Sequence, residues 1–344
     1  MNIDRLIRPN IKALKPYASA RDEFKEFSSD MVFLDANENP FDNGVNRYPD
    51  PQQLVVKRKL SEIKNIPVEN ILLGNGSDEV LDLIFRVFCE PNQDNIITLP
   101  PTYGMYSVLA NLNAIDIVAV QLNSDFEPNV DDILKSQNDN SKLLFICSPN
   151  NPTANSFEAQ RIEKLIKLFK GIVVVDEAYI DFSSEESWLS RLNEFPNLIV
   201  TQTLSKAYGM AGIRLGVCFA STQIVDTLNK IKPPYNVNEL TQSKALERLV
   251  NFDEVKQEVS GILKERQLLT QKLKDILFIE NVYASDANFL LVKVDDATKR
   301  YNQLIRKGIV VRNRTNQVLC ENCLRFTVGT STENNKLIET LKAL

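Results

Sequence analysis

Short apolar runs alternate with longer helical patterns through the middle of this 344-residue chain. Several runs are apolar on consecutive residues, which is typical of parallel strands that are covered by helices on both faces of a sheet. The alternation therefore predicts an α/β fold. We expect strands over residues 96–99, 115–120, 143–147, 172–175, 198–201 and 215–220.

The clearest helical pattern lies between the expected strands 143–147 and 172–175. Ser156 is its expected N-cap, and Gly171 follows its last turn. The apolar side chains of its inner face recur at helical spacing, at Ile162, Leu165, Ile166 and Phe169. We expect this helix to cross over between two buried, parallel strands.

The character of the sequence changes after two consecutive prolines, Pro233 and Pro234. A charged helical pattern runs over 238–277, and we expect a break near its middle, where Asp253 would cap a second helix. Beyond it, the pattern predicts strands over 289–294, 309–311 and 324–328, and helices that start near Asp296 and Ser331.

We therefore divide the chain into three parts. An N-terminal arm covers residues 1–30, a large domain covers 31–240, and a small C-terminal α+β domain covers 241–344. We expect the arm to contribute to the small domain. The length of the chain suits one large and one smaller hydrophobic core.

The composition favours a globular protein that acts on a small molecule. The chain is 43% hydrophobic and 25% charged. Its net charge of -5 is spread along the sequence, and no cluster of basic residues is suited to bind a nucleic-acid backbone. No stretch approaches the roughly 18 apolar residues of a membrane span, and the N-terminus lacks the apolar core of a secretory signal. We expect a cytoplasmic protein with no nucleic-acid or membrane partner.

The sequence contains no histidine, which excludes several kinds of chemistry. Catalysis by Ser-His-Asp or Cys-His groups and zinc sites built on histidine are impossible. Cys320 and Cys323 form a lone CxxC pair without the further ligands of a metal site, so we expect no metal. Any proton that the protein moves must be carried by Lys, Asp, Glu, Tyr, Cys or water.

One lysine lies in a loop rich in glycine and hydroxyl groups, in the segment TLSKAYGMAGIRLG. Taken alone, Lys206 would be an ordinary surface lysine. Its neighbours favour a binding site, because Thr203, Ser205 and Arg214 offer hydrogen bonds to an anion such as phosphate. A lysine in such a loop is suited to hold a phosphorylated aromatic aldehyde as a Schiff base.

Asp176 stands at the carboxyl end of the expected strand 172–175, where open α/β sheets bind their ligands. A carboxylate there can pair with a protonated pyridine nitrogen and keep it cationic. The hydroxyl of Tyr179, three residues later, can bond to the phenolic oxygen of such a ring. The alternative is that Asp176 only caps the helix that follows.

Three further motifs are candidates for the same site, each with an ordinary alternative. Tyr103, in PPTYGMY, either stacks on a planar ring or is a core tyrosine. Asn151, in SPNNPT, either serves the site or belongs to a common Asn-Pro turn. Ser77 and Asp78 follow two glycines and open a helix whose N-terminus either cradles a phosphate or is simply capped.

Taken together, the content and order of these motifs resemble the fold-type I pyridoxal-phosphate enzymes of the aspartate-aminotransferase superfamily. The resemblance covers nearly the whole chain, and SPNNPT and TLSKAYGMAGIRLG are its most specific pieces. It implies a large domain with a mostly parallel, seven-stranded sheet sandwiched by helices. It also implies pyridoxal 5'-phosphate as the cofactor.

By that resemblance, each of these residues has an expected role. Lys206 would be the Schiff-base lysine, and Asp176 would be the partner of the pyridine nitrogen. Tyr179 and Asn151 would bind the phenolic oxygen, and Tyr103 would stack on the ring. The groups that would hold the cofactor phosphate are Ser77, Asp78, Thr203, Ser205 and Arg214.

Finer motifs, namely KPYASAR, LDANENP and NRYPDP, are similar to those of histidinol-phosphate aminotransferases. The resemblance implies amino transfer between L-histidinol phosphate and 2-oxoglutarate, which gives imidazole-acetol phosphate and glutamate. It also implies a homodimer in which Tyr48 reaches the cofactor phosphate of the neighbouring subunit. Arg325 would bind the carboxylate of the substrate that has one. Arg312 and Tyr17 would bind the phosphate of histidinol phosphate, and Asn37 would line the substrate site.

Related activities of the same fold are the alternatives, namely an aromatic amino-acid aminotransferase or a threonine-phosphate decarboxylase. A non-catalytic, cofactor-binding regulator is a further one. The chain also departs from the family pattern at two positions. Ala154 stands where a glycine is usual, which strains the backbone by about 1–3 kcal/mol if its φ is positive. Tyr208 is a variant in the loop after the lysine.

Overall fold

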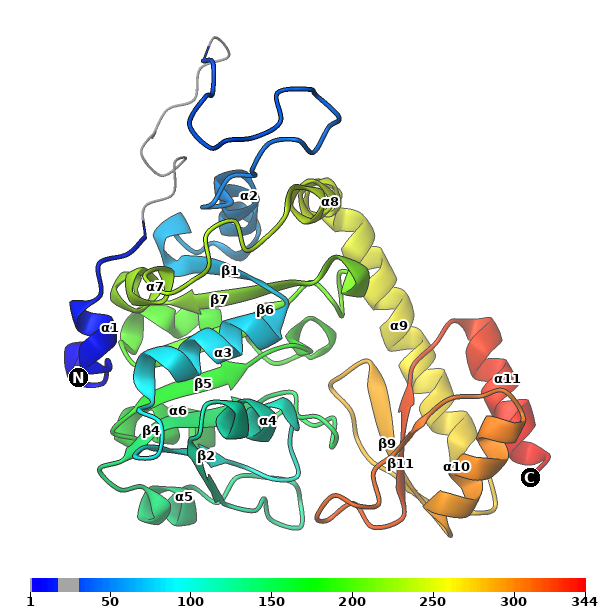
Figure 1. The fold of residues 1–344 in the computed structure, drawn as a ribbon. Helices are drawn as coiled ribbons and strands as arrows, with labels where there is room; N and C mark the ends of the chain where they lie inside the picture. Colours follow the sequence, from blue (N-terminus) through cyan, green and yellow to red (C-terminus); the bar gives the residue numbers. More distant parts are fainter. Residues whose placement is uncertain (1, 18–30) are drawn as a thin grey trace.

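The computed structural model describes residues 2–17 and 31–344, and its centre is a seven-stranded sheet with the strand order β1-β7-β6-β5-β4-β2-β3 (Figure 1). Strand β7 is antiparallel to both of its neighbours, and the other strands are parallel to one another. The expectation of a mostly parallel, seven-stranded sheet is therefore confirmed. The strands are β1 (Ile71–Asn75), β2 (Asn95–Thr98), β3 (Asp116–Ala119), β4 (Ser141–Cys147), β5 (Ile172–Asp176), β6 (Leu198–Thr203) and β7 (Leu215–Ala220).

Each of the six apolar runs expected to be strands overlaps one of the strands β2 to β7, although residues 99, 115 and 120 lie outside them. Strand β1 was not predicted, because it has only three apolar residues, and a glycine pattern typical of a helix N-terminus follows them. The burial of β1 is nevertheless complete over its first four residues.

Helices cover both faces of this sheet. One face packs against α2 (Leu54–Lys64), α5 (Val130–Ser136) and α6 (Ala159–Leu168). The other packs against α3 (Ser77–Phe88), α4 (Met105–Leu112) and α7 (Thr222–Asn229). Alternate residues of β4 separate accordingly: Leu144 belongs to the first core and Phe145 to the second. Both faces of the central strands are thus buried, as their continuous apolar runs require.

Helix α6 begins later than its pattern predicted. Its N-cap is Glu158 and not Ser156. The backbone N–H of Ser156 donates to the Asp286 carboxylate at 2.9 Å, and its hydroxyl lies 3.0 Å from that of Ser183. These long-range partners hold Ser156 outside the helix. A cap assigned from sequence could not foresee them.

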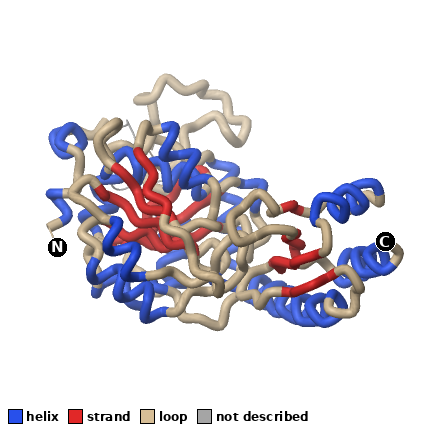
Figure 2. Tube along the Cα trace, turned by 90° about the horizontal axis from the view of Figure 1, so that it is seen from below, coloured by secondary structure: helices blue, strands red, loops and turns tan. Residues whose placement is uncertain are grey.

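A second, antiparallel sheet of four strands lies beside the first and is clearly separate from it (Figure 2). Helices α9 (Phe252–Leu273), α10 (Ala297–Arg306) and α11 (Ser331–Lys342) pack on one of its faces and share a core with it. This confirms a smaller α+β unit. Its strands, in the order β10-β11-β9-β8, are β8 (Ile279–Val282), β9 (Phe289–Val294), β10 (Arg312–Asn313) and β11 (Cys323–Thr327).

Two details of this second unit differ from the expectation. The apolar run 309–311 is not a strand; the strand begins one residue later, where the backbone pairs with β11. Strand β8 was missed, because only its two end residues are apolar. The observed helix starts agree with the predicted ones to within one residue. Asp296 caps α10, and Thr330, rather than Ser331, caps α11.

The charged helical pattern divides as expected into α8 (Glu239–Val250) and α9. The residue at the junction is Asn251, so Asp253 lies in the first turn of α9 and does not cap it. Leu249 of α8 is buried with the large sheet, whereas Leu269 and Leu273 of α9 belong to the second core. We propose that α9 is the connection between the two domains; the boundary at residue 240 stays a prediction.

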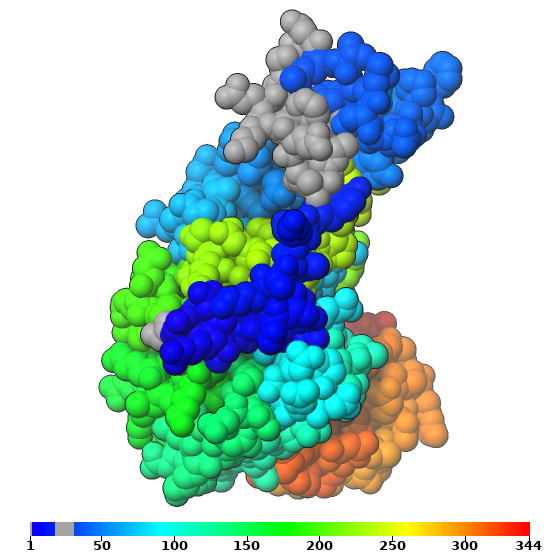
Figure 3. Space-filling view, turned by 60° about the vertical axis from the view of Figure 1, so that its left-hand side comes forward, coloured from blue at the N-terminus to red at the C-terminus, as the bar shows by residue number. Residues whose placement is uncertain are grey.

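The first residues of the arm, through η1 (Ile3–Arg5) and α1 (Pro9–Ala13), lie along the large domain (Figure 3). Ile3, Ile7 and Ile11 are buried in the core that contains α3 and α7. This described part of the arm therefore supports the large domain, and the expected contribution to the small domain is wrong for it. Across the described residues, no helix combines the length and apolar content that crossing a membrane requires.

Candidate active site

The carboxyl ends of the parallel strands meet at one edge of the large sheet, and the loops that leave them surround a cavity. Strands β1, β2, β4, β5 and β6 all end at this edge. Every residue expected to hold the cofactor, except Tyr48, lines this cavity. The lining consists of Ser77, Asp78, Tyr103, Cys147, Asn151, Asp176, Ala178, Tyr179, Thr203, Ser205, Lys206 and Arg214.

Lys206 follows β6 in a tight turn, in which the Gly209 amide donates to the Lys206 carbonyl at 3.0 Å. Its Nζ lies 5.6 Å from the centroid of the Tyr179 ring. Burial and then the positive charge of Arg325 lower the pKa of Lys206 below its ordinary value. A lysine with a lowered pKa is a better nucleophile and base near neutral pH.

Asp176 is the last residue of β5 and is only 3% exposed. Its Oδ2 accepts a hydrogen bond from the Tyr106 hydroxyl at 2.7 Å, and its Oδ1 accepts one from the Ala178 amide at 3.2 Å. Burial raises the pKa of Asp176, and the bond from Tyr106 opposes that rise. Among the described residues, no ion pair neutralises this carboxylate, so it can accept a cationic ligand.

Tyr179 comes next along the same loop and caps the short helix η4 (Ile180–Phe182). Helix capping is therefore not the role of Asp176, and that alternative is wrong. The Tyr179 ring packs edge-on against Phe289 of the second sheet, with the centroids 5.1 Å apart. Burial raises the pKa of Tyr179 above its ordinary value, so its hydroxyl stays protonated and able to donate.

Asn151 and Tyr103 reach the cavity from two other loops. The Asn151 side-chain oxygen accepts a hydrogen bond from the Arg325 guanidinium, which joins the large domain to the second sheet. The Tyr103 hydroxyl donates to the Asp78 carboxylate at 3.2 Å. The cavity therefore contains every group expected around an aromatic ring; the roles of these groups toward one stay predictions.

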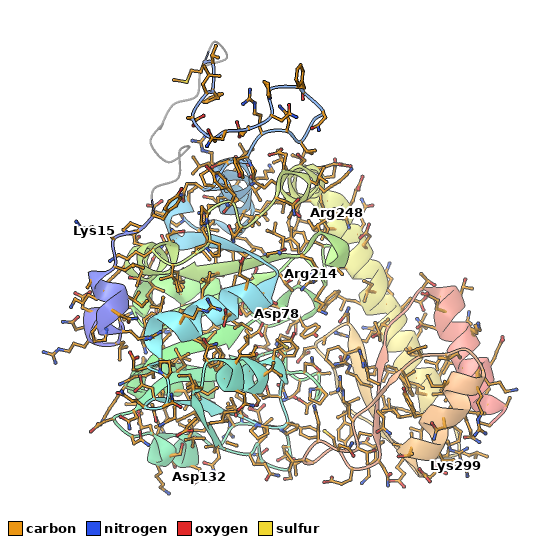
Figure 4. The ribbon with its side chains drawn as sticks, viewed as in Figure 1. Lys15, Asp78, Asp132, Arg214, Arg248 and Lys299 are labelled. Atoms are coloured by element: carbon orange, nitrogen blue, oxygen red, sulfur yellow. The ribbon has the colours of Figure 1, made fainter. Side chains whose placement is uncertain are left out.

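The N-terminus of α3 forms one end of the cavity. Its N-cap, Gly76, has a φ of 82° and provides no side-chain cap. A Cβ there would lie 2.7 Å from the guanidinium of Arg214. Arg214 in turn approaches the Ser205 hydroxyl at 3.5 Å and the Asp78 carboxylate at 3.8 Å; Figure 4 labels Asp78 and Arg214 on facing segments. Uncapped amides, a hydroxyl and a guanidinium thus converge, which suits a phosphate.

Two small residues fix the backbone around the cavity. A Cβ on Gly216 would lie 2.3 Å from the Ser77 amide nitrogen, so only glycine permits β7 to approach α3 this closely. Ala154 has a φ of 71°, which is the strained case considered for this departure from the family pattern. This conformation costs a non-glycine residue about 1–2 kcal/mol.

The substrate residues expected from the N-terminal segments do not reach this cavity within one chain. Tyr17 is 75% exposed and lies beside Pro51 and Lys232. Asn37 and Tyr48 line a different hollow, where the Tyr48 ring stacks on that of Tyr235 with centroids 4.5 Å apart. Their expected roles stay predictions.

The two expected arginines lie directly opposite each other, Arg312 on β10 and Arg325 on β11. Arg325 is half-buried, and its guanidinium carbon lies 5.0 Å from the centroid of the Phe289 ring. Burial and then the charge of Arg314 lower the pKa of Arg325 to about 10. Arg312 is exposed.

Comparison with known proteins decides the family. The sequence profile described as "Aminotransferase class I and II" matches residues 26–341. The chain belongs to the class I and II aminotransferases. The aminotransferase is also 62% identical over 344 residues to a protein of Flavobacterium johnsoniae named histidinol-phosphate aminotransferase, a match that covers 100% of this chain and 99% of that protein.

Solved structures share the fold of this aminotransferase. The histidinol-phosphate aminotransferase from Clostridium acetobutylicum superposes with a TM-score of 0.80 at 24% identity, over 87% of this chain and 90% of that one. The L-threonine-O-3-phosphate decarboxylase from Porphyromonas gingivalis gives a TM-score of 0.74 at 19% identity, over 87% and 90%. The fold-type I class is thus confirmed. The fold alone does not separate an aminotransferase from a decarboxylase.

The sequence analysis missed several residues of the aminotransferase site. Tyr106 holds Asp176, and its position one helical turn after Tyr103 was the signal that could have identified it. Cys147 and Ala178 also line the cavity. Asn150 is fully buried, and its amide donates to the Pro101 carbonyl at 2.8 Å, which ties the Tyr103 loop to the Asn151 loop.

The CxxC pair of this aminotransferase lies near the second sheet. Both thiols are free and buried. Burial raises the pKa of Cys320 to about 12 and that of Cys323 to about 11, so both stay protonated at neutral pH. Among the described residues, no cluster of side chains is suited to bind a metal ion.

Proposed function

We propose that this aminotransferase uses pyridoxal 5'-phosphate to move an amino group between L-histidinol phosphate and 2-oxoglutarate. The observation that carries the proposal is the pairing of Lys206, with its lowered pKa, and Asp176, a buried carboxylate without a cation, in one cavity. The name of the 62% identical relative supports the substrate.

The residues present fit this cofactor. A pyridinium nitrogen would provide the cation that the buried Asp176 carboxylate lacks among the described residues. The uncapped N-terminus of α3 and the Arg214 guanidinium form a cradle for a phosphate, which a side chain at Gly76 would fill. The ring nitrogen and the phosphate of the cofactor therefore each have a chemically suitable partner in the cavity.

Each group then has a definite task. Lys206 would bind the aldehyde carbon covalently, Asp176 would hold the ring nitrogen, and Tyr103 would stack on the ring. Tyr179 and Asn151 would donate hydrogen bonds to the phenolic oxygen. The phosphate would be held by the amides of Ser77 and Asp78 and by the side chains of Thr203, Ser205 and Arg214.

The bound cofactor supplies an electron sink for negative charge on the substrate carbon. Lys206 would do the acid–base work: as a free amine, its Nζ would take the proton from the substrate carbon that bears the amine. Burial and the charge of Arg325 keep a larger fraction of this amine unprotonated, as a base requires. No histidine is needed, which agrees with its absence from the sequence.

The two arginines of the second sheet suit both partners of the reaction. Glutamate carries an α-carboxylate, whereas histidinol phosphate has none and offers a phosphate. A guanidinium forms paired hydrogen bonds with either anion. We therefore assign Arg325, at the rim of the cavity, to the carboxylate, and Arg312 to the phosphate with Tyr17 and Asn37 nearby in the assembled enzyme.

The assembled enzyme would be a homodimer. Residues 31–50 extend away from the body of the chain (Figure 1) and carry exposed apolar side chains, including Val32, Leu34 and Phe41. Such a surface is typical of an interface with a second copy. Tyr48 lies on this segment, outside its own cavity, and would reach the cofactor phosphate of the partner.

We also propose that the enzyme works in the cytoplasm. All five cysteines are free and buried, and none forms a disulfide. Unpaired thiols suit a reducing compartment. Cell fractionation with an antibody to the native protein would test this; recovery from a periplasmic or secreted fraction would contradict it.

The activity is tested by single-turnover reactions of the cofactor-loaded enzyme with three amines. L-Histidinol phosphate should react at the lowest half-saturating concentration, followed by L-phenylalanine and O-phospho-L-threonine. A preference for phenylalanine would refute the substrate and keep the aminotransferase. Release of carbon dioxide from phosphothreonine would instead identify a decarboxylase.

A further inference from the structure

Arg314 is a third arginine at the second sheet, and no motif of the sequence singled it out. It follows β10, and its amide donates to the Cys323 carbonyl of β11 at 2.9 Å, which continues the antiparallel pairing. Residues two apart on a strand share a face of the sheet, as do residues directly opposite each other. Arg312, Arg314 and Arg325 therefore lie on the same face.

That face points toward the large domain. On β11, Leu324 and Phe326 belong to the core beneath α9, α10 and α11, on the opposite face. Cys323, on the face of Arg325, is instead buried in the core of the large sheet. Arg314, opposite Cys323, thus lies on the face of the second sheet that packs against the large domain.

The charge distribution around Tyr179 agrees with this placement. Burial raises the pKa of Tyr179, and the positive charges of Arg325 and Arg314 oppose the rise. Burial and the neighbouring Arg312 also lower the pKa of Arg314 itself. The positive charge of Arg314 therefore acts on Tyr179, which lines the cavity.

The free chain leaves this arginine cluster without an anion. Among the described residues, none of the three arginines forms a salt bridge, and the side chain of Arg314 has no hydrogen-bond partner at its buried Nε. The Nε of Arg325 is likewise buried without a partner. A buried N–H group without an acceptor is costly, and an anion that accepts from it removes the cost.

Other polar groups beside Arg314 are unsatisfied in the same way. The Thr315 hydroxyl and the Gln317 side-chain oxygen are buried without a hydrogen-bond partner. Four such atoms thus belong to the short stretch of chain between residues 314 and 325. Buried polar atoms without partners are rare in folded proteins, so a ligand that supplies partners would account for this concentration of them.

We propose that Arg314 is a substrate-binding residue that, with Arg312, holds the phosphate of the amine substrate and makes the enzyme select phosphorylated amines. This rests on the function proposed above. Arg325, held by Asn151, would remain available for the α-carboxylate of glutamate. A phosphate dianion has enough charge and acceptor oxygens for two guanidinium groups.

The test compares wild type with Arg314→Gln and Arg314→Lys in the full-length, cofactor-loaded enzyme. Half-saturating concentrations are measured in single-turnover reactions for L-histidinol phosphate and for L-histidinol, which lacks the phosphate. Arg314→Gln should raise the value for histidinol phosphate by about tenfold or more. The value for histidinol should stay within about twofold, and Arg314→Lys should fall between wild type and Arg314→Gln.

The matched control is Arg306→Gln, which removes an exposed arginine from α10. It should leave both half-saturating concentrations unchanged. Thermal melting separates a binding role from a structural one: Arg314→Gln should melt no lower than wild type, because it removes an unpaired, partly buried charge. An equal rise for both amines, or no rise for either, would overturn the proposal.

Competition by inorganic phosphate distinguishes failure of this proposal from failure of the proposed function. If wild type does not favour histidinol phosphate over histidinol, the proposed substrate is wrong. Arg314 is then judged by inorganic phosphate as a competitor of histidinol. Weaker competition in Arg314→Gln than in wild type supports a phosphate subsite at Arg314, and equal competition refutes it.

Discussion

The Lys206 cavity and the segment 31–50 are built in opposite ways. Asp176 and Asn151 in the cavity are almost fully buried; Asp176 ends β5, and Asn151 lies in the loop that follows β4 of the same sheet. On the segment, Val32, Leu34 and Phe41 are 82%, 88% and 80% exposed, although all three are apolar. The first region is organised by the chain itself, whereas the second exposes apolar side chains that the described residues leave uncovered.

This difference explains which site residues one chain brings together. Residues that follow strands of the same sheet must meet, because those strands end at one edge. Tyr17, Asn37 and Tyr48 are on segments that no sheet holds, and none of them lines the cavity. We therefore predict that a substitution in the cavity impairs the site of its own subunit. A substitution in the segment 31–50 should instead impair the site of the partner subunit.

The largest effect is expected for Lys206→Ala. Turnover should fall by about three orders of magnitude or more, because the variant has neither the covalent attachment nor the base. In wild type, borohydride reduction in the presence of pyridoxal 5'-phosphate should attach the cofactor at Lys206, as read by peptide mass spectrometry. Lys299→Ala, an exposed change on α10, is the control and should behave as wild type. Full turnover of Lys206→Ala would remove the basis of the mechanism.

Asp176→Asn should lower turnover by about 100-fold, because a neutral amide does not hold a cationic ring nitrogen. Tyr106→Phe removes only the hydroxyl that bonds to Asp176 at 2.7 Å, and its loss should be about fivefold. Single-turnover rates of both variants measure the two effects. If Asp176→Asn had no larger effect than Tyr106→Phe, Asp176 would be a structural residue only.

Tyr48→Ala should weaken cofactor binding about tenfold, through the lost contact to the partner's cofactor phosphate. Mixing it with Lys206→Ala tests the sharing directly. A mixed dimer contains one site with both residues intact, so at a cofactor concentration too low to load Tyr48→Ala alone, a refolded equimolar mixture should regain about a quarter of wild-type activity. Activity that is only the average of the two variants would show that Tyr48 acts within its own subunit or not at all.

The smallest effect concerns the pH at which Lys206 loses its proton. The pKa of Lys206 lies below its ordinary value, so its free amine persists at lower pH than that of an exposed lysine. Arg325→Gln removes a positive charge that lowers this pKa, and the pKa should therefore rise. The acetylation rate of Lys206 in the cofactor-free protein, followed against pH by mass spectrometry, should shift to higher pH. No shift would show that Arg325 does not influence Lys206.

Much of the cavity could be predicted because its residues are adjacent in sequence to strong apolar runs. Asp176, Asn151 and Lys206 each follow a run whose pattern identifies it as a buried strand. The predictions were wrong where a side chain or amide is held by a hydrogen-bond partner that is remote in sequence. Ser156 looks like a helix cap, yet Asp286, 130 residues away, holds it outside the helix.

Arg314 shows the same limit for function. Its position in the sequence does not distinguish it from an ordinary strand-end arginine. Only the pairing of β10 with β11 reveals that it shares a face with Arg325 and that this face points toward the large domain.

The sequence by itself determined the fold class, the edge of the sheet that holds the cavity and the absence of histidine chemistry. Local patterns encode these, because alternation and strand ends depend on neighbouring residues. The tertiary structure decided the hydrogen bond from Tyr106 to Asp176, the shared face of three arginines and the exclusion of Tyr17, Asn37 and Tyr48 from the cavity. These depend on contacts between distant segments, which no local pattern contains.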